Sequence, residues 1–219
     1  MQGPYVQRAP TARGANRSQA PIAFLDRDGV INIGRAGYVN NASQMRLHEG
    51  AARGIASLKQ AGYTVCIVTN QSPIIRGLWG PDRLIELHQA LQSQLHDVDP
   101  LATIDLFLTC PHRYEDHCPC RKPSPGMLHL GHQLLRGQEQ EQFSWHPINV
   151  PIQQQTIDWW GEKPRPPHPL DAMVGDRGSD MGAGWAYGAR LFRVPGAIGL
   201  AAVVDRIINE EDGGDSFQP

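Results

Sequence analysis

The sequence of 219 residues has no long hydrophobic run, few cysteines and little lysine. No stretch approaches the roughly 20 apolar residues of a membrane-spanning helix, so we expect no membrane partner. Residues 1–20 are polar and lack the apolar centre of a signal peptide, and we expect them to form a disordered tail. Four cysteines in a chain of this length do not make a disulfide scaffold. These features predict a protein of the reducing cytoplasm.

The charge balance is nearly even, with 20 Lys and Arg against 22 Asp and Glu and a net charge of −2. Dedicated nucleic-acid binders usually carry a basic surface, so we expect no nucleic-acid partner. Forty per cent of the residues are hydrophobic, which suits a globular protein with a sizeable core. We predict one domain over residues 21–209 and a C-terminal tail over 210–219, and we expect a monomer.

Short apolar runs alternate with segments of helical periodicity, which predicts an α/β domain with a parallel sheet flanked by helices. The expected strands are 22–25, 64–69, 104–109, 172–175 and 190–194, and the expected helices are 49–61, one opened by Pro81, 125–135 and 179–187. Residues 137–169, rich in Gln, Pro and Trp, break this alternation. We expect a surface insertion there with local packing, although Trp159 and Trp160 could also cover a site or meet a partner.

Three polar clusters follow expected strands, and a fourth precedes the expected helix at 125–135. Ligands bind beyond the carboxyl ends of the strands in such sheets, so these clusters should meet at one edge. Paired carboxylates can hold Mg²⁺, and a threonine hydroxyl and a lysine can bind phosphoryl oxygens. The clusters are Asp26-Arg27-Asp28-Gly29, Thr69-Asn70-Gln71-Ser72, Arg121-Lys122-Pro123 and Gly175-Asp176-Arg177-Gly178-Ser179-Asp180.

Three of the four cysteines lie close together in a hydrophilic segment. The pattern is Cys110-Pro111-His112-x5-Cys118-Pro119-Cys120. Three thiolates and one imidazole make a closed tetrahedral Zn²⁺ site, which is structural and not catalytic. His117 is an alternative ligand to His112, but its direct adjacency to Cys118 makes it the poorer one. The remaining cysteine, Cys66, lies in an apolar strand and reads as a buried small side chain.

The four polar clusters resemble the motifs of the haloacid dehalogenase superfamily of phosphatases, over residues 22 to 194. The resemblance implies a Rossmann-like core with a minimal, loop-only cap and an aspartyl-phosphate mechanism. In that mechanism Asp26 is the nucleophile and Asp28 the general acid and base. The implied Mg²⁺ ligands are Asp26, the backbone carbonyl of Asp28, and Asp176. Thr69 and Lys122 would stabilise the phosphoryl group, and Asp180 would support the metal shell or Lys122.

Longer strings are similar to the histidinol-phosphate and heptose-bisphosphate phosphatase subfamily, in which the same Cys/His arrangement occurs. They are the nine residues from Phe24 to Asn32, the five from Val68 to Ser72 and the nine from Cys120 to Leu128. The similarity is greatest to the heptose-bisphosphate members and implies removal of the 7-phosphate of D-glycero-D-manno-heptose 1,7-bisphosphate. The substrate contacts that it implies are Arg35, Gly37, Tyr38, Asn70, Gln71, Ser72, Arg121 and Arg177.

Other functions remain open at this stage. Histidinol phosphate or another small sugar phosphate is the main alternative substrate within the same reaction. A 3′-phosphatase acting on nucleic-acid ends would share the chemistry, but the negative net charge disfavours it. A non-catalytic, zinc-stabilised interaction module is disfavoured because every motif residue is present.

Overall fold

The computed structural model describes residues 3–8, 19–137 and 144–219 and contains a seven-stranded sheet in the order β5-β1-β4-β3-β2-β6-β7. The strands are β1 (Tyr5–Gln7), β2 (Ile22–Leu25), β3 (Thr64–Asn70), β4 (Leu106–Cys110), β5 (Ile148–Asn149), β6 (Ala172–Gly175) and β7 (Arg190–Arg193). Strands β2, β3, β4, β6 and β7 pair in parallel. Strand β1 pairs antiparallel with β4 and with β5. The expected α/β fold is confirmed, with a sheet that is mixed at one edge.

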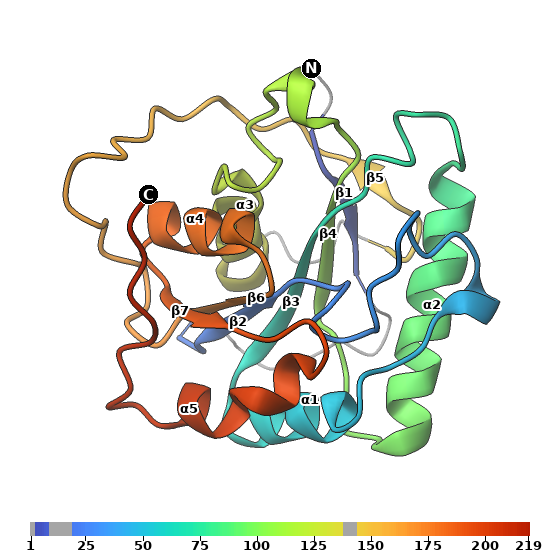
Figure 1. Cartoon of the computed structure of the whole chain (residues 1–219), viewed down its shortest axis with the longest axis horizontal. Coiled ribbons are helices and arrows are strands. Elements are labelled where there is room, and N and C mark those ends of the chain that lie inside the picture. The colour runs from blue at the N-terminus through green and yellow to red at the C-terminus, as the bar shows by residue number, and fades with distance from the viewer. Residues whose placement is uncertain (1–2, 9–18, 138–143) are drawn as a thin grey trace.

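Helices cover both faces of this sheet (Figure 1). The helices are α1 (Ala51–Gln60), α2 (Pro81–Val98), α3 (Gly126–Arg136), α4 (Gly178–Tyr187) and α5 (Val204–Ile208), with 3₁₀ turns η1 (Ala42–Gln44), η2 (Tyr114–Asp116) and η3 (Gly199–Ala202). Helices α1, α2 and α5 pack on one face, and α3 and α4 pack on the other. None of the helices in the described part of the chain has the length and apolarity of a membrane span.

The central strands divide their side chains between two cores because successive residues of a strand point to opposite faces. In β2, Ala23 and Leu25 join the core beneath α1, α2 and α5, whereas Ile22 and Phe24 join the core beneath α3 and α4. All four side chains are completely buried. A strand that is buried on both faces has a continuous run of apolar residues, and this run is the pattern that predicted β2 from the sequence.

The expectation of a disordered tail over residues 1–20 is wrong for residues 5–7. These residues form β1, which lies inside the sheet between β4 and β5. Val6 and Gln7 are completely buried. A strand of three residues is too short to show a hydrophobic period, and it forms through pairing with distant residues. Its own sequence therefore does not predict it. Residues 1–2 and 9–18 of the expected tail lie outside the described residues.

The expected insertion over 137–169 is described from residue 144 onward, and residues 138–143 lie outside the described part. Its strand β5 extends the sheet beyond β1. Ile152, Ile157 and Trp159 pack against the core beneath α3 and α4, and Trp159 stacks on Trp185 with ring centroids 5.8 Å apart. The local packing that we expected therefore holds for this segment.

The C-terminal segment after α5 is attached to the sheet. The backbone N–H of Asp215 donates to the carbonyl of Leu191 in β7, at 2.6 Å. Arg206 of α5 forms ion pairs with Asp212 and Asp215, each at 2.9 Å. Phe217 packs against the core beneath α3 and α4. The segment expected as a tail thus runs along the edge strand of the sheet.

Candidate active site

Three charged side chains from different parts of the chain meet at the carboxyl end of β2. The Lys122 ammonium lies 2.9 Å from Asp26 Oδ1 and 2.7 Å from Asp180 Oδ1. Asp26 follows β2, Lys122 precedes α3, and Asp180 lies in the first turn of α4. All three residues are at least nine-tenths buried. The sheet therefore brings a lysine and two carboxylates into contact at a largely water-excluded point.

This burial changes the protonation of Asp26. Removal from water disfavours the carboxylate and raises the pKa of Asp26 to about 7, against the opposing attraction of Lys122. Burial alone would lower the pKa of Lys122, but the carboxylates of Asp180 and Asp26 outweigh it and raise this pKa. The lysine is thus held charged beside a carboxyl group that titrates near neutrality.

A third carboxylate, Asp176, completes an acidic cluster. Asp26, Asp176 and Asp180 each offer an oxygen, and these oxygens lie within 4.8 Å of one another. Asp176 Oδ1 is buried and accepts no hydrogen bond from the described residues; the nearest cation that pairs with it is Arg177 at 3.8 Å. Burial and the nearby Asp180 raise the pKa of Asp176. A buried carboxylate oxygen without a donor, among other acids, fits a divalent cation with oxygen ligands.

Two glycines allow this close approach. A Cβ at Gly29 would lie 2.6 Å from Asp176 Oδ2, and Gly29 has a φ of +87°. A Cβ at Gly175 would lie 2.1 Å from the Cβ of Asp180. Neither distance is sterically possible for a real side chain. Both positions therefore require glycine for the acidic cluster to form.

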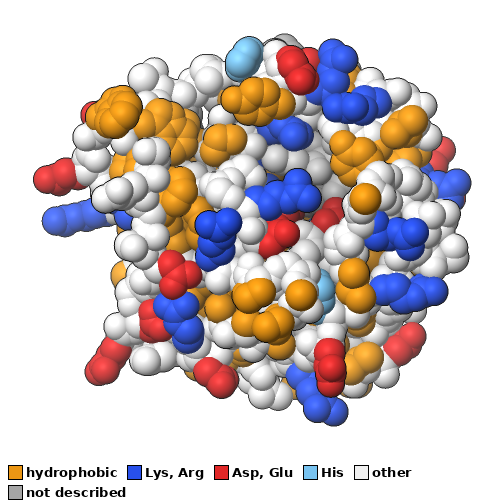
Figure 2. Space-filling view, in the orientation of Figure 1, with side chains coloured by type: hydrophobic (Ala, Val, Ile, Leu, Met, Phe, Trp, Pro, Cys, Tyr) orange, Lys and Arg blue, Asp and Glu red, His pale blue; other side chains and the backbone are white. Residues whose placement is uncertain are grey.

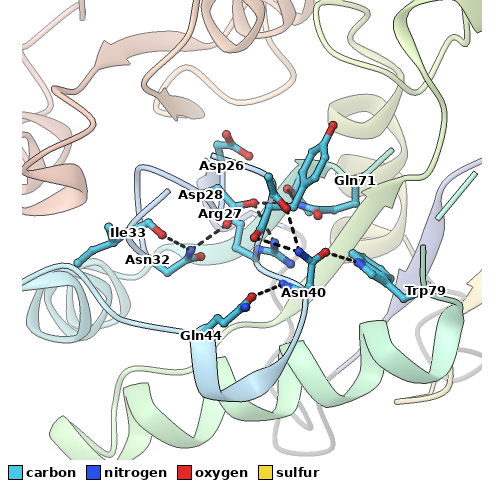
Figure 3. Close-up of polar contacts among 12 residues, drawn as sticks. Asp26, Arg27, Asp28, Asn32, Ile33, Asn40, Gln44, Gln71 and Trp79 are labelled. Carbon is cyan, nitrogen blue, oxygen red and sulfur yellow. Dashed lines mark hydrogen bonds and ion pairs between the residues drawn. The ribbon is translucent and has the colours of Figure 1, made fainter. Parts of the chain in front are cut away.

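Asp28 lies beside the acidic cluster but has its own partners (Figure 3). Its Oδ2 accepts hydrogen bonds from Arg27 Nη2 and Gln71 Nε2, both at 2.8 Å, and its Oδ1 accepts from Asn32 Nδ2 at 2.8 Å. Burial by itself would raise the pKa of Asp28, but Arg27 and these hydrogen bonds together lower it. Asp28 is thus an ionised carboxylate held by three donors.

Residues after β3 fix the lysine. The side chain of Asn70 donates to the carbonyl of Lys122 at 3.1 Å and accepts from its backbone N–H at 3.2 Å. Thr69 is buried, and its hydroxyl oxygen accepts a hydrogen bond from Gln71 Nε2 at 3.0 Å. We expected Gln71 to contact substrate, but its side chain is buried and serves Asp28 and Thr69 instead.

A cavity of about 480 Å³ opens above these groups. Figure 2 shows a hollow with acidic side chains at its base and Lys and Arg side chains around it. Three arginines from different loops, Arg35, Arg121 and Arg177, lie in its wall. The predicted residues in the lining are Asp26, Asp28, Arg35, Gly37, Tyr38, Thr69, Asn70, Ser72, Arg121, Lys122, Arg177 and Asp180. The cavity therefore combines an acidic floor with a basic rim.

The loop over residues 35–38 is held by residues that the sequence did not single out. Tyr38 has a φ of +71°, an uncommon backbone conformation for a residue with a side chain, and its hydroxyl lies 3.1 Å from Ser72 Oγ. Asn40 donates to the carbonyls of Gly37 and Tyr38, and its Oδ1 accepts from Trp79 Nε1 at 3.1 Å (Figure 3). Asn40 and Trp79 thus support one wall of the cavity.

Tyr114 is a further residue that sequence reasoning missed. It lies in η2, is 70% exposed and lines the cavity beside Arg121. No motif names it, because it lies in the stretch of unspecified residues between His112 and Cys118. Only the predicted zinc loop, which brings η2 to the cavity, could have indicated it.

The predicted Cys and His ligands form a compact buried cluster. The ligand atoms of Cys110, His112, Cys118 and Cys120 all lie within 4.8 Å of one another. The Sγ of Cys120 lies 3.0 Å from the Sγ of Cys110 and of Cys118, and 3.5 Å from His112 Nδ1. These separations exceed an S–S bond of about 2.05 Å, and all three cysteines are free thiols. His117 is exposed and lies outside the cluster.

The pKa values of the thiols in this cluster are strongly perturbed. Burial raises the pKa of Cys110 to about 12 and also raises the pKa of Cys120. Hydrogen bonds from Cys110 and Cys120 lower the pKa of Cys118 to about 2. Four convergent soft ligands, buried together and connected directly to Arg121, fit a tetrahedral Zn²⁺. The carbonyl of His112 accepts a hydrogen bond from Arg121 Nη1 at 2.7 Å, so the cluster and the cavity wall are joined.

Comparison with solved structures indicates the same architecture. A protein from Mesorhizobium loti described as a HAD-like phosphatase superposes with a TM-score of 0.70 at 23% identity, covering 98% of this chain and 96% of that one. The D,D-heptose 1,7-bisphosphate phosphatase of B. bronchiseptica, complexed with magnesium and phosphate, superposes with a TM-score of 0.65 at 24% identity, covering 87% and 99%. The fold is therefore that of the haloacid dehalogenase-like phosphatases, as the sequence motifs predicted.

No family model matches the chain. Individual relatives of known name indicate which phosphatases it is similar to. The D-glycero-beta-D-manno-heptose-1,7-bisphosphate 7-phosphatase of Vibrio cholerae is 40% identical over 115 residues, which cover 49% of this chain and 60% of that protein. The D-glycero-alpha-D-manno-heptose-1,7-bisphosphate 7-phosphatase of Mycobacterium tuberculosis is 34% identical over 159 residues, covering 72% and 68%. The chain belongs to the heptose-1,7-bisphosphate 7-phosphatase family. Its match to the first relatives spans about 60% of their length.

Proposed function

We propose that this protein is a Mg²⁺-dependent phosphomonoester hydrolase that acts through an aspartyl-phosphate intermediate. One observation carries the proposal: a buried carboxylate, Asp26, lies at the base of an open cavity in ion-pair contact with Lys122. A carboxylate can attack phosphorus, and a lysine can bind the phosphoryl oxygens. The names of the curated relatives and the fold of the solved phosphatases support this assignment.

In the first half of the reaction, an oxygen of Asp26 attacks phosphorus while the bond from phosphorus to the substrate oxygen breaks. The Thr69 hydroxyl and the Lys122 ammonium contact the transferring phosphoryl group, whose charge they stabilise. Asp26, the backbone carbonyl of Asp28, and Asp176 would hold Mg²⁺. The metal supplies positive charge that screens the repulsion between an anionic nucleophile and an anionic phosphate.

Asp28 transfers the proton in both halves of the reaction. It protonates the leaving oxygen of the substrate in the first half, and in the second half it takes a proton from the water that attacks the aspartyl phosphate. Its three hydrogen-bond donors and its lowered pKa favour the carboxylate. The resting arrangement therefore suits the second half, in which Asp28 is a base. Asp180 contacts Lys122, which fits a supporting role.

For the substrate, we propose D-glycero-D-manno-heptose 1,7-bisphosphate, cleaved at the 7-phosphate. That phosphate is on a primary carbon and can reach Asp26 at the cavity floor. The 1-phosphate would remain at the rim, where Arg35, Arg121 and Arg177 line the wall. Guanidinium groups bind phosphate well because they present several planar donors. The names of the relatives, which include both the beta and the alpha anomer, agree with this substrate class.

For the Cys/His cluster, we propose one structural Zn²⁺ that stabilises the loop leading into Arg121 and Lys122. The cluster's four ligands leave no open position for substrate, so its contribution to activity is to hold this loop in place. Arg121 receives this support directly, because its guanidinium donates to the carbonyl of the ligand His112.

A turnover panel tests the proposed function. We expect the protein with Mg²⁺ to hydrolyse one or both anomers of heptose 1,7-bisphosphate with the highest kcat/KM and to leave the 1-phosphate in place. The panel also contains histidinol phosphate, fructose 1,6-bisphosphate and a 3′-phosphorylated oligonucleotide. Preference for one of those compounds would keep the reaction and replace the substrate. No release of phosphate from any compound would contradict the enzymatic assignment itself.

A further inference from the structure

Arg27 occupies the middle position of the Asp26-Arg27-Asp28 motif, and the proposed mechanism gives it no role. Its side chain is completely buried. In Figure 3 it extends away from Asp26, beneath Asp28. Among the described residues, its ion-pair partner is Asp28, at 2.8 Å from Nη2 to Oδ2. Burying an unpaired cation is strongly unfavourable, so the burial of this guanidinium depends on the carboxylate of Asp28.

The remaining donors of Arg27 are also buried. Its Nε and Nη1 make no hydrogen bond to the described residues. Its backbone carbonyl, in contrast, accepts from the N–H groups of Val30, Ile31 and Asn32, at 3.4, 3.0 and 3.1 Å. The turn after Asp28 is therefore wound around the Arg27 carbonyl. The backbone carbonyl and the side chain of Arg27 therefore both contact residues of the segment 28–32.

His88 of α2 is another completely buried polar side chain. Its ring stacks on Phe107 with centroids 4.3 Å apart, and its Nδ1 lies 2.7 Å from Gln7 Oε1. The side-chain amide of Gln7 donates to the carbonyl of Trp145 at 3.1 Å, which leaves its oxygen to accept the proton of His88 Nδ1. Burial and the charge of Arg27 lower the pKa of His88, so this ring is neutral and adds no second positive charge to that of Arg27, whose counter-ion is Asp28.

We propose that Arg27 is a positioning residue that fixes the Asp28 carboxylate in its working orientation. The inference rests on the proposed function, since Asp28 is the proton-transfer group of that reaction. Arg27 does not line the cavity. The planar guanidinium of Arg27 donates to the Asp28 carboxylate along a fixed direction. Asn32 and Gln71 each donate one further hydrogen bond to the same carboxylate.

The test is a double-mutant cycle with Arg27→Met and Asp28→Asn, read both as kcat and as Tm. Arg27→Met should lower kcat roughly 10- to 100-fold, a part of the 10²- to 10⁴-fold that a positioned acid or base contributes, and should change KM by less than about threefold. In the Asp28→Asn background the same substitution should change kcat by less than about twofold, because Arg27 acts through Asp28. Arg27→Lys, which keeps the charge, should recover part of the loss.

The Tm values test the pairing without any need for turnover. Asp28→Asn leaves the guanidinium buried without its counter-ion and should lower Tm by roughly 5 to 15 °C. In the Arg27→Met background the same change should lower Tm far less. If Arg27→Met does not fold, the cycle is run with Arg27→Gln, which is also neutral. Arg136→Met is the matched control: it breaks a buried ion pair with Asp171, before β6 and away from the cavity, and should lower Tm without lowering kcat.

Two outcomes overturn the proposal. One is a folded Arg27→Met protein with the kcat of the original chain, or with the same loss in both backgrounds. The other is a Tm change on Asp28→Asn that does not depend on residue 27. If the original chain hydrolyses none of the phosphomonoesters, the proposed function fails, and with it the catalytic role of Arg27. The Tm cycle then still decides whether Arg27 and Asp28 are energetically paired.

Discussion

Lys122 Nζ lies 2.9 Å from Asp26 Oδ1. Lys122 precedes α3 by a few positions, and Asp26 directly follows β2. Neither side chain could be buried alone without a large desolvation cost. Together, and with Asp180 as a second carboxylate, they form a charged group beneath the cavity. The contact also joins the chemistry to the zinc loop, because Lys122 lies two residues after Cys120.

Replacing Asp26 tests the nucleophile. Asp26→Asn keeps the shape of the side chain and removes the attacking carboxylate, so we expect kcat to fall at least roughly 10³-fold with the fold retained. Steady-state kinetics and thermal unfolding measure the two effects separately. Asp105→Asn is the matched control: Asp105 is buried and paired with Lys59 at the start of β4, and its loss should affect stability and leave kcat unchanged. A normal kcat for Asp26→Asn would exclude the aspartyl-phosphate mechanism.

Binding of Mg²⁺ should depend on pH in a defined direction. Because the pKa of Asp26 is raised to about 7, most of this carboxyl group is protonated below that pH and must lose its proton to bind the metal. We expect Mg²⁺ affinity to rise about tenfold for each pH unit up to about 7 and then to level off. Isothermal titration calorimetry at several pH values measures this. The same slope in Asp26→Asn would show that another group releases the proton.

The stability of the metal-free protein should change with pH in the opposite direction to its Mg²⁺ affinity. A carboxyl group with a raised pKa binds its proton more tightly in the folded protein than in the unfolded chain. Its contribution to the free energy of unfolding is therefore largest at low pH and is lost as the pH rises from about 4 to about 7. We expect the metal-free protein to lose Tm across this window relative to Asp26→Asn. Added Mg²⁺ should restore it, because the metal binds the folded carboxylate.

Asp28→Asn separates proton transfer from metal binding. We expect slower turnover, by roughly 10² to 10⁴ in kcat, because the variant can neither donate nor accept the proton. Mg²⁺ affinity should be unchanged, since the proposed ligand is the backbone carbonyl of Asp28. Asp176→Asn is the contrasting variant and should weaken Mg²⁺ binding, because its buried Oδ1 accepts no other bond from the described residues. Loss of Mg²⁺ affinity in Asp28→Asn would instead make the side chain a ligand.

The zinc site predicts one Zn²⁺ per chain in protein purified without chelators, as elemental analysis can measure. His112→Ala should lose the metal and, with it, both Tm and activity, because the loop carries Arg121 and Lys122. His117→Ala is the matched control. It changes the exposed histidine next to Cys118 and should retain zinc. Zinc retained in His112→Ala and lost in His117→Ala would reverse the ligand assignment.

The sequence predicted those features that follow from local patterns. The apolar run Ile22–Leu25 predicted a strand, and all four of its side chains are buried. The polar residues after this run predicted the position of the site. The sequence did not predict β1, whose three residues form a strand through pairing with β4 and β5. Helix α5 was missed because its five residues are too few for a helical period to show.

Within the site, residue types were easier to predict than contacts. The meeting of Asp26 and Lys122 follows from parallel strands that end at one edge of a sheet. The inward turn of Gln71, which donates to Asp28 and not to a ligand, depends on side-chain packing that a motif does not encode. For the same reason the sequence did not indicate that Arg27 is buried against Asp28.

Arg121 provides the sharpest test of the substrate. Its guanidinium lines the cavity and is fixed by a 2.7 Å hydrogen bond to the carbonyl of His112, so it presents a preoriented cation on the wall beside Lys122. A bisphosphate would place its second phosphate near such a group, whereas p-nitrophenyl phosphate has no second phosphate. We therefore expect Arg121→Ala to lower kcat/KM for heptose 1,7-bisphosphate roughly 10- to 100-fold more than for p-nitrophenyl phosphate, as the loss of a charged hydrogen-bonded contact predicts.

Arg113→Ala is the control for that variant, because Arg113 is an exposed arginine of the same loop that does not line the cavity. It should affect the two substrates equally and slightly. Histidinol phosphate carries an ammonium and an imidazole where the bisphosphate carries an anion, so the arginines of the rim should disfavour it in the original chain. In Arg121→Ala this discrimination should shrink, since one repelling cation is gone. Equal losses on bisphosphate and p-nitrophenyl phosphate would place Arg121 at the transferring phosphate and remove the argument for a bisphosphate substrate.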